Sequence, residues 1–153
     1  MGRIVSINLS REKGVPKSPV EEAVLVEDLG FEGDAHAEPG IRQVSLLSME
    51  SIEQARSTLG ERALQASVQL DPGVFAENLT TEGIDLSSLD IGCLLRVGEG
   101  VQLRVSKIGK ECHHGCAILR KVGDCIMPRQ GIFCEVLMGG RVRKGDPIER
   151  FDE

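Results

Sequence analysis

The stretch LLRVGEGVQLRV, residues 94–105, indicates what kind of fold to expect. Two short apolar runs flank Gly98-Glu99-Gly100, and a loop of this length with glycine is a common connection between two antiparallel strands. The stretch therefore predicts a β-hairpin.

Similar short runs occur along the rest of the chain, each bounded by Gly or other turn residues. Residues 3–9 (RIVSINL) alternate with a period of two, as a half-buried strand does. Further strands are expected within 21–30, 43–48, 78–84 and, after a turn at 144–146, at the end of GGRVRKGDPIERF (139–151). Residues 131–140 are compatible with either strand or helix. Many short strands without alternating helices predict a mostly antiparallel β-barrel with one or two short helices.

The clearest helix follows the strand at 43–48. It is expected to start near Ser48 or Ser51, because Ser51 and Gln54 match a capping box, and to stop at Gly60. Its apolar face is formed by Ile52, Ala55 and Leu59.

The composition is that of an ordinary globular chain. With 153 residues, 41% hydrophobic and 27% charged, we expect one domain spanning 1–153. No apolar run approaches the ~20 residues of a membrane span, and the first residues do not resemble a signal peptide, so a cytoplasmic location is expected. A net charge of −6 and 3% aromatic residues disfavour nucleic acid as a partner.

Cysteine is the most informative residue type, because cytoplasmic thiols stay reduced and five Cys then suggest ligands, nucleophiles or buried small side chains. KECHHGCAI (110–118) places Cys112 beside His113 and His114, and a neighbouring cation stabilises the thiolate. Cys116 and Cys125 are further candidates. The spacing matches no common zinc knuckle, although a structural zinc site that uses Cys112 and Cys116 stays open.

Polar residues gather in two other segments. The loop 33–42 holds Asp34, His36 and Arg42, and the planar guanidinium of Arg42 suits a phosphate or carboxylate. Glu77 and Asn78 stand at the entry to a strand, where such side chains commonly satisfy loop backbone groups. Cys93 and Cys134 lie in apolar runs and are expected to be small buried side chains.

Several blocks together resemble a known family. They are GDAHAEPGIRQVSLLS (33–48), FAENLTTEGIDLSSLDIGCLLRVGEGVQLRVSKIGKECHHGCAI (75–118), VGDCIMPRQGIFCEVLMGG (122–140) and VRKGDPI (142–148). In this order they are similar to a small stand-alone MOSC domain, named after the C-terminal part of molybdenum cofactor sulfurases. The resemblance implies a β-barrel fold of the type shared with the pyruvate kinase barrel domain. It also implies binding of the molybdenum cofactor (molybdopterin), or sulfur transfer through a Cys.

The resemblance suggests roles for particular residues. It implies Cys112, then Cys125, as the working thiol and molybdenum ligand, with Cys116 as a third candidate. It implies a set of cofactor-binding residues, namely Arg42, Glu77, Asn78, His113, His114 and Arg129. One departure is Ile41, where stand-alone relatives usually have His, which argues against proton transfer by this loop.

The implied chemistry needs partners outside the chain. A Cys thiolate would accept sulfur as a persulfide from a separate cysteine desulfurase and pass it to a metal centre or a molybdoenzyme. No pyridoxal phosphate is expected in this chain itself. Sulfurtransferase or molybdenum-dependent activity, a non-catalytic cofactor carrier, and a zinc-stabilised β domain remain alternatives at this point.

Overall fold

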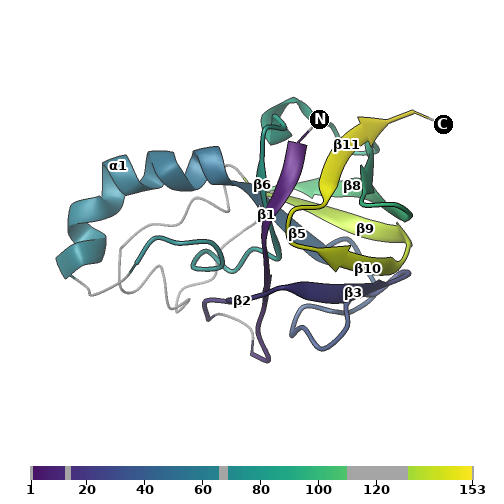
Figure 1. Ribbon diagram of the computed structural model, residues 1–153, viewed down its shortest axis with the longest axis horizontal. Coiled ribbons are helices and arrows are strands. Elements are labelled where there is room, and N and C mark those ends of the chain that lie inside the picture. Colours follow the sequence, from purple (N-terminus) through teal and green to yellow (C-terminus); the bar gives the residue numbers. More distant parts are fainter. Residues whose placement is uncertain (1, 13–14, 66–68, 110–130, 153) are drawn as a thin grey trace.

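A computed structural model describes residues 2–12, 15–65, 69–109 and 131–152. Within these residues the elements are β1 (Gly2–Leu9), β2 (Ser18–Val20), β3 (Glu22–Val26), β4 (Gly30–Phe31), β5 (Val44–Ser48), α1 (Met49–Gln65), β6 (Leu79–Glu82), the 3₁₀ turn η1 (Leu86–Ser88), β7 (Leu94–Val97), β8 (Val101–Ile108), β9 (Ile132–Met138), β10 (Gly140–Arg143) and β11 (Pro147–Phe151) (Figure 1). None of the helices in these ranges is long and apolar enough to cross a membrane.

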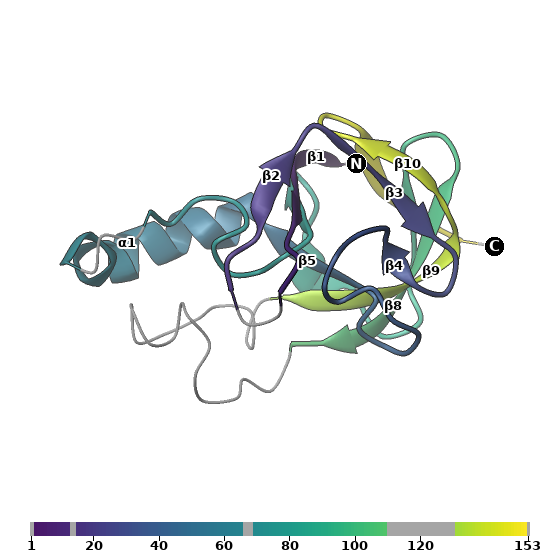
Figure 2. The same ribbon diagram turned by 90° about the horizontal axis from the view of Figure 1, so that it is seen from below.

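The main sheet closes into a barrel. Its strands follow the order β11-β7-β8-β9-β5-β6-β1, and β1 pairs with β11 to complete the ring, while β2 adds to the outside of β1. Neighbouring strands are antiparallel except for β5 and β6, which run parallel. Strands β10, β3 and β4 form a second, three-stranded sheet beside the barrel (Figure 2). The predicted mostly antiparallel barrel is confirmed.

The hairpin predicted from residues 94–105 is present. Strands β7 and β8 pair in antiparallel register from Val97 opposite Val101, and Gly98 takes a left-handed conformation with φ 62°. Residues 132–138, which the sequence left open between strand and helix, form a strand because β9 pairs with both β8 and β5.

Helix α1 differs from the prediction at its C-terminal end. Ser48 caps its N-terminus, since the Ser48 Oγ accepts a hydrogen bond of 3.1 Å from the Ser51 amide. The helix does not stop at Gly60 and continues to Gln65. Ala63, one turn further along the same face, is 3% exposed. We attribute the continuation to this burial, which offsets the ~1 kcal/mol that Gly costs inside a helix.

Two apolar clusters lie on opposite sides of the barrel wall. Alternation along β5 points Leu46 into the barrel interior and Leu47 outward, under α1. On β9 the same alternation places Ile132 inside and Phe133 outside. Ser45 pairs with Phe133 in the strand register, and it shares the outward face of β5 with Leu47. The outer face of this wall carries the polar site described below.

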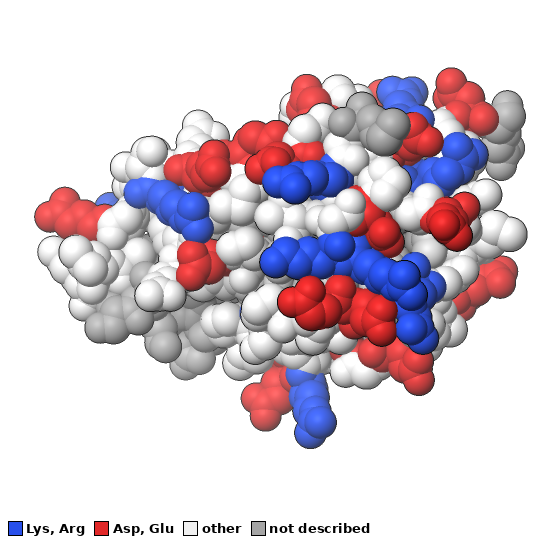
Figure 3. Space-filling view, viewed as in Figure 1, with Lys and Arg blue, Asp and Glu red and all other residues white. Residues whose placement is uncertain are grey.

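Charged side chains of both signs share the surface. On the face drawn in Figure 3, acidic and basic side chains are interspersed. Exposed ion pairs include Arg3 with Glu82 at 3.0 Å, and Glu22 with both Arg141 and Arg143 at 3.2 Å. Exposed pairs of this kind contribute little to stability, but here they compensate the arginine charges locally.

Gly60 gives a direct test of the helix description. We expect Gly60→Ala to raise the free energy of unfolding by about 0.5–1 kcal/mol, because alanine has the higher helix propensity and nothing lies within 4 Å of the added Cβ. The measurement is urea denaturation followed by circular dichroism.

Gly92→Ala is the matched control. This position also has open space, but its φ of 100° disfavours a residue with a Cβ, so the variant should lose about 1 kcal/mol. Stabilisation at Gly92, or its absence at Gly60, would contradict the backbone description.

Candidate functional site

A small polar pocket lies on the outer face of the barrel wall. Its volume is about 50 Å³, and it is lined by His36, Arg42, Ser45, Ala76, Asn78 and Phe133. Strands β5 and β9 provide its floor, and the loops 33–42 and 71–78 provide its sides. Two residues that the family resemblance implied, Arg42 and Asn78, therefore line the same pocket.

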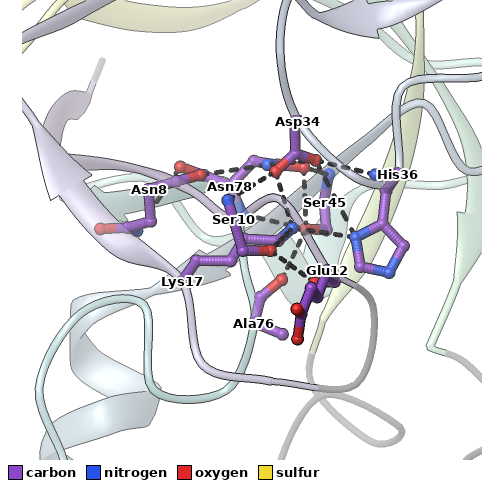
Figure 4. A network of polar contacts seen from close by, with 9 residues as sticks. All are labelled: Asn8, Ser10, Glu12, Lys17, Asp34, His36, Ser45, Ala76 and Asn78. Atoms are coloured by element: carbon purple, nitrogen blue, oxygen red, sulfur yellow. Dashed lines mark hydrogen bonds and ion pairs between the residues drawn. The ribbon is translucent and has the colours of Figure 1, made fainter.

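Asp34 is the centre of the hydrogen bonds behind this pocket (Figure 4). Its Oδ1 accepts from the Ser10 amide at 3.0 Å and from the Lys17 Nζ at 2.8 Å. Its Oδ2 accepts from the His36 amide and the Asn78 Nδ2, both at 3.2 Å. The side chains of Lys17 and Asp34 are 0% and 1% exposed, so the ion pair is almost completely removed from water.

The contacts of Asp34 also set its protonation state. Burial by itself raises the pKa of Asp34, but the hydrogen bond and charge of Lys17, together with the Ser10 and Asn78 hydrogen bonds, outweigh burial and hold the pKa below its ordinary value. Asp34 is therefore ionised at neutral pH and balances the positive charge of Lys17.

Asn78 ties three segments together. Its Oδ1 accepts from the amide and the hydroxyl of Ser45 at 3.1 and 3.2 Å. Its Nδ2 donates to the carbonyl of Asn8 at 3.1 Å as well as to Asp34. Both polar atoms of the amide are thus engaged, and Asn78 links Ser45, Asn8 and Asp34 at the pocket wall.

The backbone next to Asn78 is strained. Ala76 has a φ of 65°, a left-handed conformation that is uncommon for a residue other than Gly. The Ala76 amide donates to the Gly73 carbonyl at 2.9 Å, and its own carbonyl accepts from the Ser45 hydroxyl at 3.4 Å. Strain at a pocket-lining residue is a feature that often accompanies function.

Arg42 provides positive charge at the mouth of the pocket. The side chain is exposed, and its Cζ lies 6.0 Å from the centre of the buried Phe133 ring. Among the described residues no carboxylate forms an ion pair with Arg42. The neighbouring Ile41 is exposed, and its carbonyl accepts a hydrogen bond of 2.6 Å from Ser106 on β8, which fixes the loop against the wall.

Glu77, the third described residue of the predicted set, does not line this pocket. It is 0% exposed, and its Oε2 accepts a hydrogen bond of 2.7 Å from Thr80. Burial raises the pKa of Glu77 to about 7, although the Gly73 and Phe75 amides and Thr80 oppose the rise. Its Oε1 has no hydrogen-bond partner of good geometry. Glu77 is thus a buried carboxyl outside the pocket lining, and burial brings its pKa to about 7.

The predicted thiols and their neighbours lie outside the described residues. These are Cys112, His113, His114, Cys116, Cys125 and Arg129. The described residues on either side, Gly109 and Gly131, are joined by a backbone hydrogen bond of 2.7 Å, and Phe133 of the pocket follows two residues later. In the described part of the chain, no group of three His, Cys, Asp or Glu is placed to hold a metal ion.

The two described cysteines behave largely as expected. Cys134 is buried, and burial raises the pKa of its thiol far above the ordinary value. Cys134 is therefore an unreactive core residue. Cys93 is only half-buried, packs against the core and accepts a hydrogen bond of 3.3 Å from the Asp90 amide.

Sequence reasoning missed part of the site. Lys17 lies in a short Pro-flanked segment with no local signal for an ion pair. The positions of Ser45 and Phe133 could have been predicted from the sequence. Side chains alternate along a strand, so these two lie on the face opposite to that of Leu46 and Ile132, which point inward.

A second, larger cavity lies where β5 meets α1. It has a volume of about 690 Å³, which is within the range of ligand pockets. Its lining includes the acidic Glu50 and Asp85 and the apolar Ile108 and Ile132. No Lys or Arg lines it among the described residues, so it is poorly suited to an anionic group.

The family assignment follows from the sequence and the fold together. The sequence model of the MOSC domain matches residues 32–149, and the chain belongs to this family. A comparison with curated proteins finds no match.

Solved structures share the fold. The crystal structure of YuaD from Bacillus subtilis is similar over 97% of this chain and 94% of that one, with a TM-score of 0.71 and 22% sequence identity. YiiM from Geobacillus stearothermophilus gives a TM-score of 0.74 with 20% identity over 99% of this chain and 76% of its own. YiiM from Escherichia coli gives 0.73 with 22% identity over 100% and 71%.

Glu77 predicts a pH dependence of stability. Because its pKa rises from 4.5 in the unfolded chain to about 7 in the fold, the folded state binds the proton more tightly. The unfolded chain then releases this proton first as the pH rises. Wild-type stability should fall by about 3 kcal/mol, relative to Glu77→Gln, between pH 4.5 and 8.

Urea unfolding of both proteins across this range measures the difference. Asp34 does not interfere, since its lowered pKa makes its contribution change only at more acidic pH. A constant difference between wild type and Glu77→Gln would show that Glu77 does not titrate in this window.

Proposed function

We propose that this protein binds the molybdenum cofactor and carries sulfur to a metal centre on a Cys thiolate. The observation that carries the proposal is the exposed guanidinium of Arg42 at the mouth of a small pocket, in a chain of the MOSC family. Arg binds phosphate oxygens through a planar pair of donors, and the cofactor ends in a phosphate.

The size of the pocket limits which part of the cofactor it takes. A volume of about 50 Å³ has room for a phosphate-sized group and excludes the pterin ring. The larger cavity has the volume for a ring system, but Glu50 and Asp85 disfavour a phosphate there. We therefore place the phosphate at Arg42, with the rest of the cofactor outside the small pocket.

The residues of the site have separable tasks. Arg42 binds and orients the phosphate, while Asn78 and Ser45 hold the pocket wall through their mutual hydrogen bonds. The buried Phe133 ring lies on one side of the guanidinium, 6.0 Å from its Cζ to the ring centre. The bound cofactor itself supplies a molybdenum centre soft enough to accept a sulfur ligand.

The thiol in this proposal is Cys112, with Cys125 as the second candidate. Cys112 is preferred because His113 and His114 follow it directly in the sequence, and a neighbouring cation stabilises a thiolate. The thiolate attacks the outer sulfur of a desulfurase persulfide. A new S–S bond forms on this chain, the S–S bond of the donor breaks, and the donor leaves as a thiolate.

Anaerobic purification tests the cofactor. We expect molybdenum and pterin fluorescence to copurify with the wild type, and Arg42→Ala to lower the loading by about tenfold or more, since a hydrogen bond to a charged group contributes about 1.5–3 kcal/mol. Arg42→Lys, which keeps the charge but loses the planar pair, should retain an intermediate loading. Stoichiometric zinc without molybdenum, or equal loading in all three proteins, would contradict the proposal.

Separate Ser variants test the thiol. Incubated with a cysteine desulfurase and cysteine, Cys112→Ser should lose the persulfide that mass spectrometry detects as a gain of one sulfur atom. Cys125→Ser should keep it. Full persulfide formation in Cys112→Ser excludes this residue as the sulfur carrier, and full cofactor loading without any persulfide in the wild type would favour a non-catalytic cofactor carrier.

A further inference from the structure

We propose that Ser106 is a positioning residue for Arg42: its hydroxyl, together with the side-chain amide of Gln43, fixes the backbone from which the guanidinium reaches an anionic group. The inference rests on the proposed function, because it takes Arg42 as the residue that binds the phosphate. It adds two side chains that lie outside the described lining of the small pocket.

The segment before β5 lacks the backbone contacts of a strand. Gly40, Ile41 and Arg42 are all exposed and precede the first residue of β5. No backbone–backbone hydrogen bond joins Gly40 or Ile41 to another described residue. The segment is held instead by side chains of neighbouring residues.

The Ser106 hydroxyl binds the carbonyl that immediately precedes Arg42. Its Oγ lies 2.6 Å from the Ile41 carbonyl oxygen and 3.2 Å from the Phe133 carbonyl oxygen. A hydroxyl has one proton to donate, and only the shorter distance is typical of an O–H···O hydrogen bond, so the proton points to Ile41. Because the peptide group between Ile41 and Arg42 is planar, this hydrogen bond sets the orientation of the plane that ends at the Arg42 Cα.

A bulge in β8 presents Ser106 to this segment. The register with β9 shifts between Val105 and Lys107, which leaves Ser106 as the additional residue of β8. Lys107 stands opposite Phe133 of the pocket. Bulges of this kind redirect side chains and are frequent next to functional sites. The bulge thus lies beside the pocket wall, where Ser106 reaches the segment before Arg42.

Gln43 binds the carbonyl one residue earlier. Its Nε2 donates to the Gly40 carbonyl at 3.0 Å and to the Asp28 Oδ1 at 2.9 Å. Its Oε1 accepts from the Val136 amide of β9 at 2.9 Å, and the residue is fully buried. The carbonyls of Gly40 and Ile41, two consecutive residues, are therefore both bound by side chains.

A fixed backbone makes Arg42 a better receptor for an anion. A ligand loses affinity when binding has to order a flexible segment, and a segment that is already ordered reduces this cost. With its backbone held, Arg42 keeps its guanidinium beside the Phe133 ring at the pocket mouth. Without the Ser106 hydroxyl, the ligand would have to order the segment, and binding would weaken.

Backbone order parameters from nitrogen-15 relaxation test the positioning without a ligand. In the wild type the Arg42 amide should have the value of rigid backbone, about 0.85, and in Ser106→Ala the value should fall toward about 0.6. Ser106→Thr, which keeps the hydroxyl, should restore the wild-type value. Equal order parameters in the wild type and Ser106→Ala overturn the inference.

Ser88→Ala is the matched control for the loss of a hydroxyl. The Ser88 Oγ also donates to a backbone carbonyl, that of Asp85, at 2.8 Å, but η1 does not contribute to the described lining of the small pocket. The order parameter of Arg42 should stay at its wild-type value in this variant. A fall as large as that in Ser106→Ala would overturn the inference, because the effect would not be specific to Ser106.

Calorimetry with inorganic phosphate at pH 7.5 tests the consequence for binding. Ser106→Ala should bind about fivefold more weakly than the wild type, a factor expected for one hydrogen bond, and Ser106→Thr should bind within about twofold. Wild-type affinity in Ser106→Ala, or loss of binding in Ser106→Thr as well, overturns the inference. A Ser106→Ala protein that does not fold also overturns it, because the hydroxyl would then support the fold and not the site.

The two proposals fail in different ways. A wild type without molybdenum or pterin, but with phosphate binding that Ser106→Ala weakens and Ser106→Thr restores, refutes the cofactor proposal alone. A wild type loaded with cofactor, whose loading and Arg42 order parameter are unchanged in Ser106→Ala, refutes this inference alone. A wild type that binds no phosphate overturns this inference together with the placement of the phosphate at Arg42.

Discussion

The ion pair between Lys17 and Asp34 is the interaction on which the pocket depends. Removing two charges from water costs several kcal/mol per ion. The attraction between the two ions offsets this cost only when the remaining lone pairs of the carboxylate and the remaining protons of the ammonium are also hydrogen-bonded. Here Ser10, His36 and Asn78 supply the remaining hydrogen bonds of Asp34. Removing one partner would leave the other charge buried without compensation, which costs about 3–5 kcal/mol.

The barrel gives these loops a fixed support. Side chains alternate along β5 and β9 between the apolar interior of the barrel and its outer face. Leu46 and Ile132 therefore pack in the core, whereas Ser45 and Phe133 line the pocket. The strain at Ala76 persists because hydrogen bonds to Gly73 and Ser45 hold it in place. Rigid strands carrying polar loops are a common way to place functional groups.

The sequence allowed the strands to be located, because period-two patterns and glycine turns are local signals, as in the hairpin at 94–105. Gly60 misled the reading of α1, since the burial of Ala63 that extends the helix is a tertiary effect. The family resemblance implied Arg42 and Asn78 as site residues, and the structure places both at one pocket. Lys17 had no such signal, because its contact with Asp34 exists only once the barrel has formed. The predicted thiols lie outside the described residues, and their roles stay predictions.

The closure of the barrel has a consequence for how the chain folds. The pairing of β1 with β11 joins residues separated by almost the whole sequence, such as Gly2 and Ile148. Contacts of this range are slow to form, because the entropy of closing a long loop is lost before the contact repays it. Until β11 arrives, β1 and β7 each expose an unpaired edge to other chains. Aggregation during refolding should therefore depend more on how fast β1 and β11 pair than on the free energy of unfolding of the folded barrel.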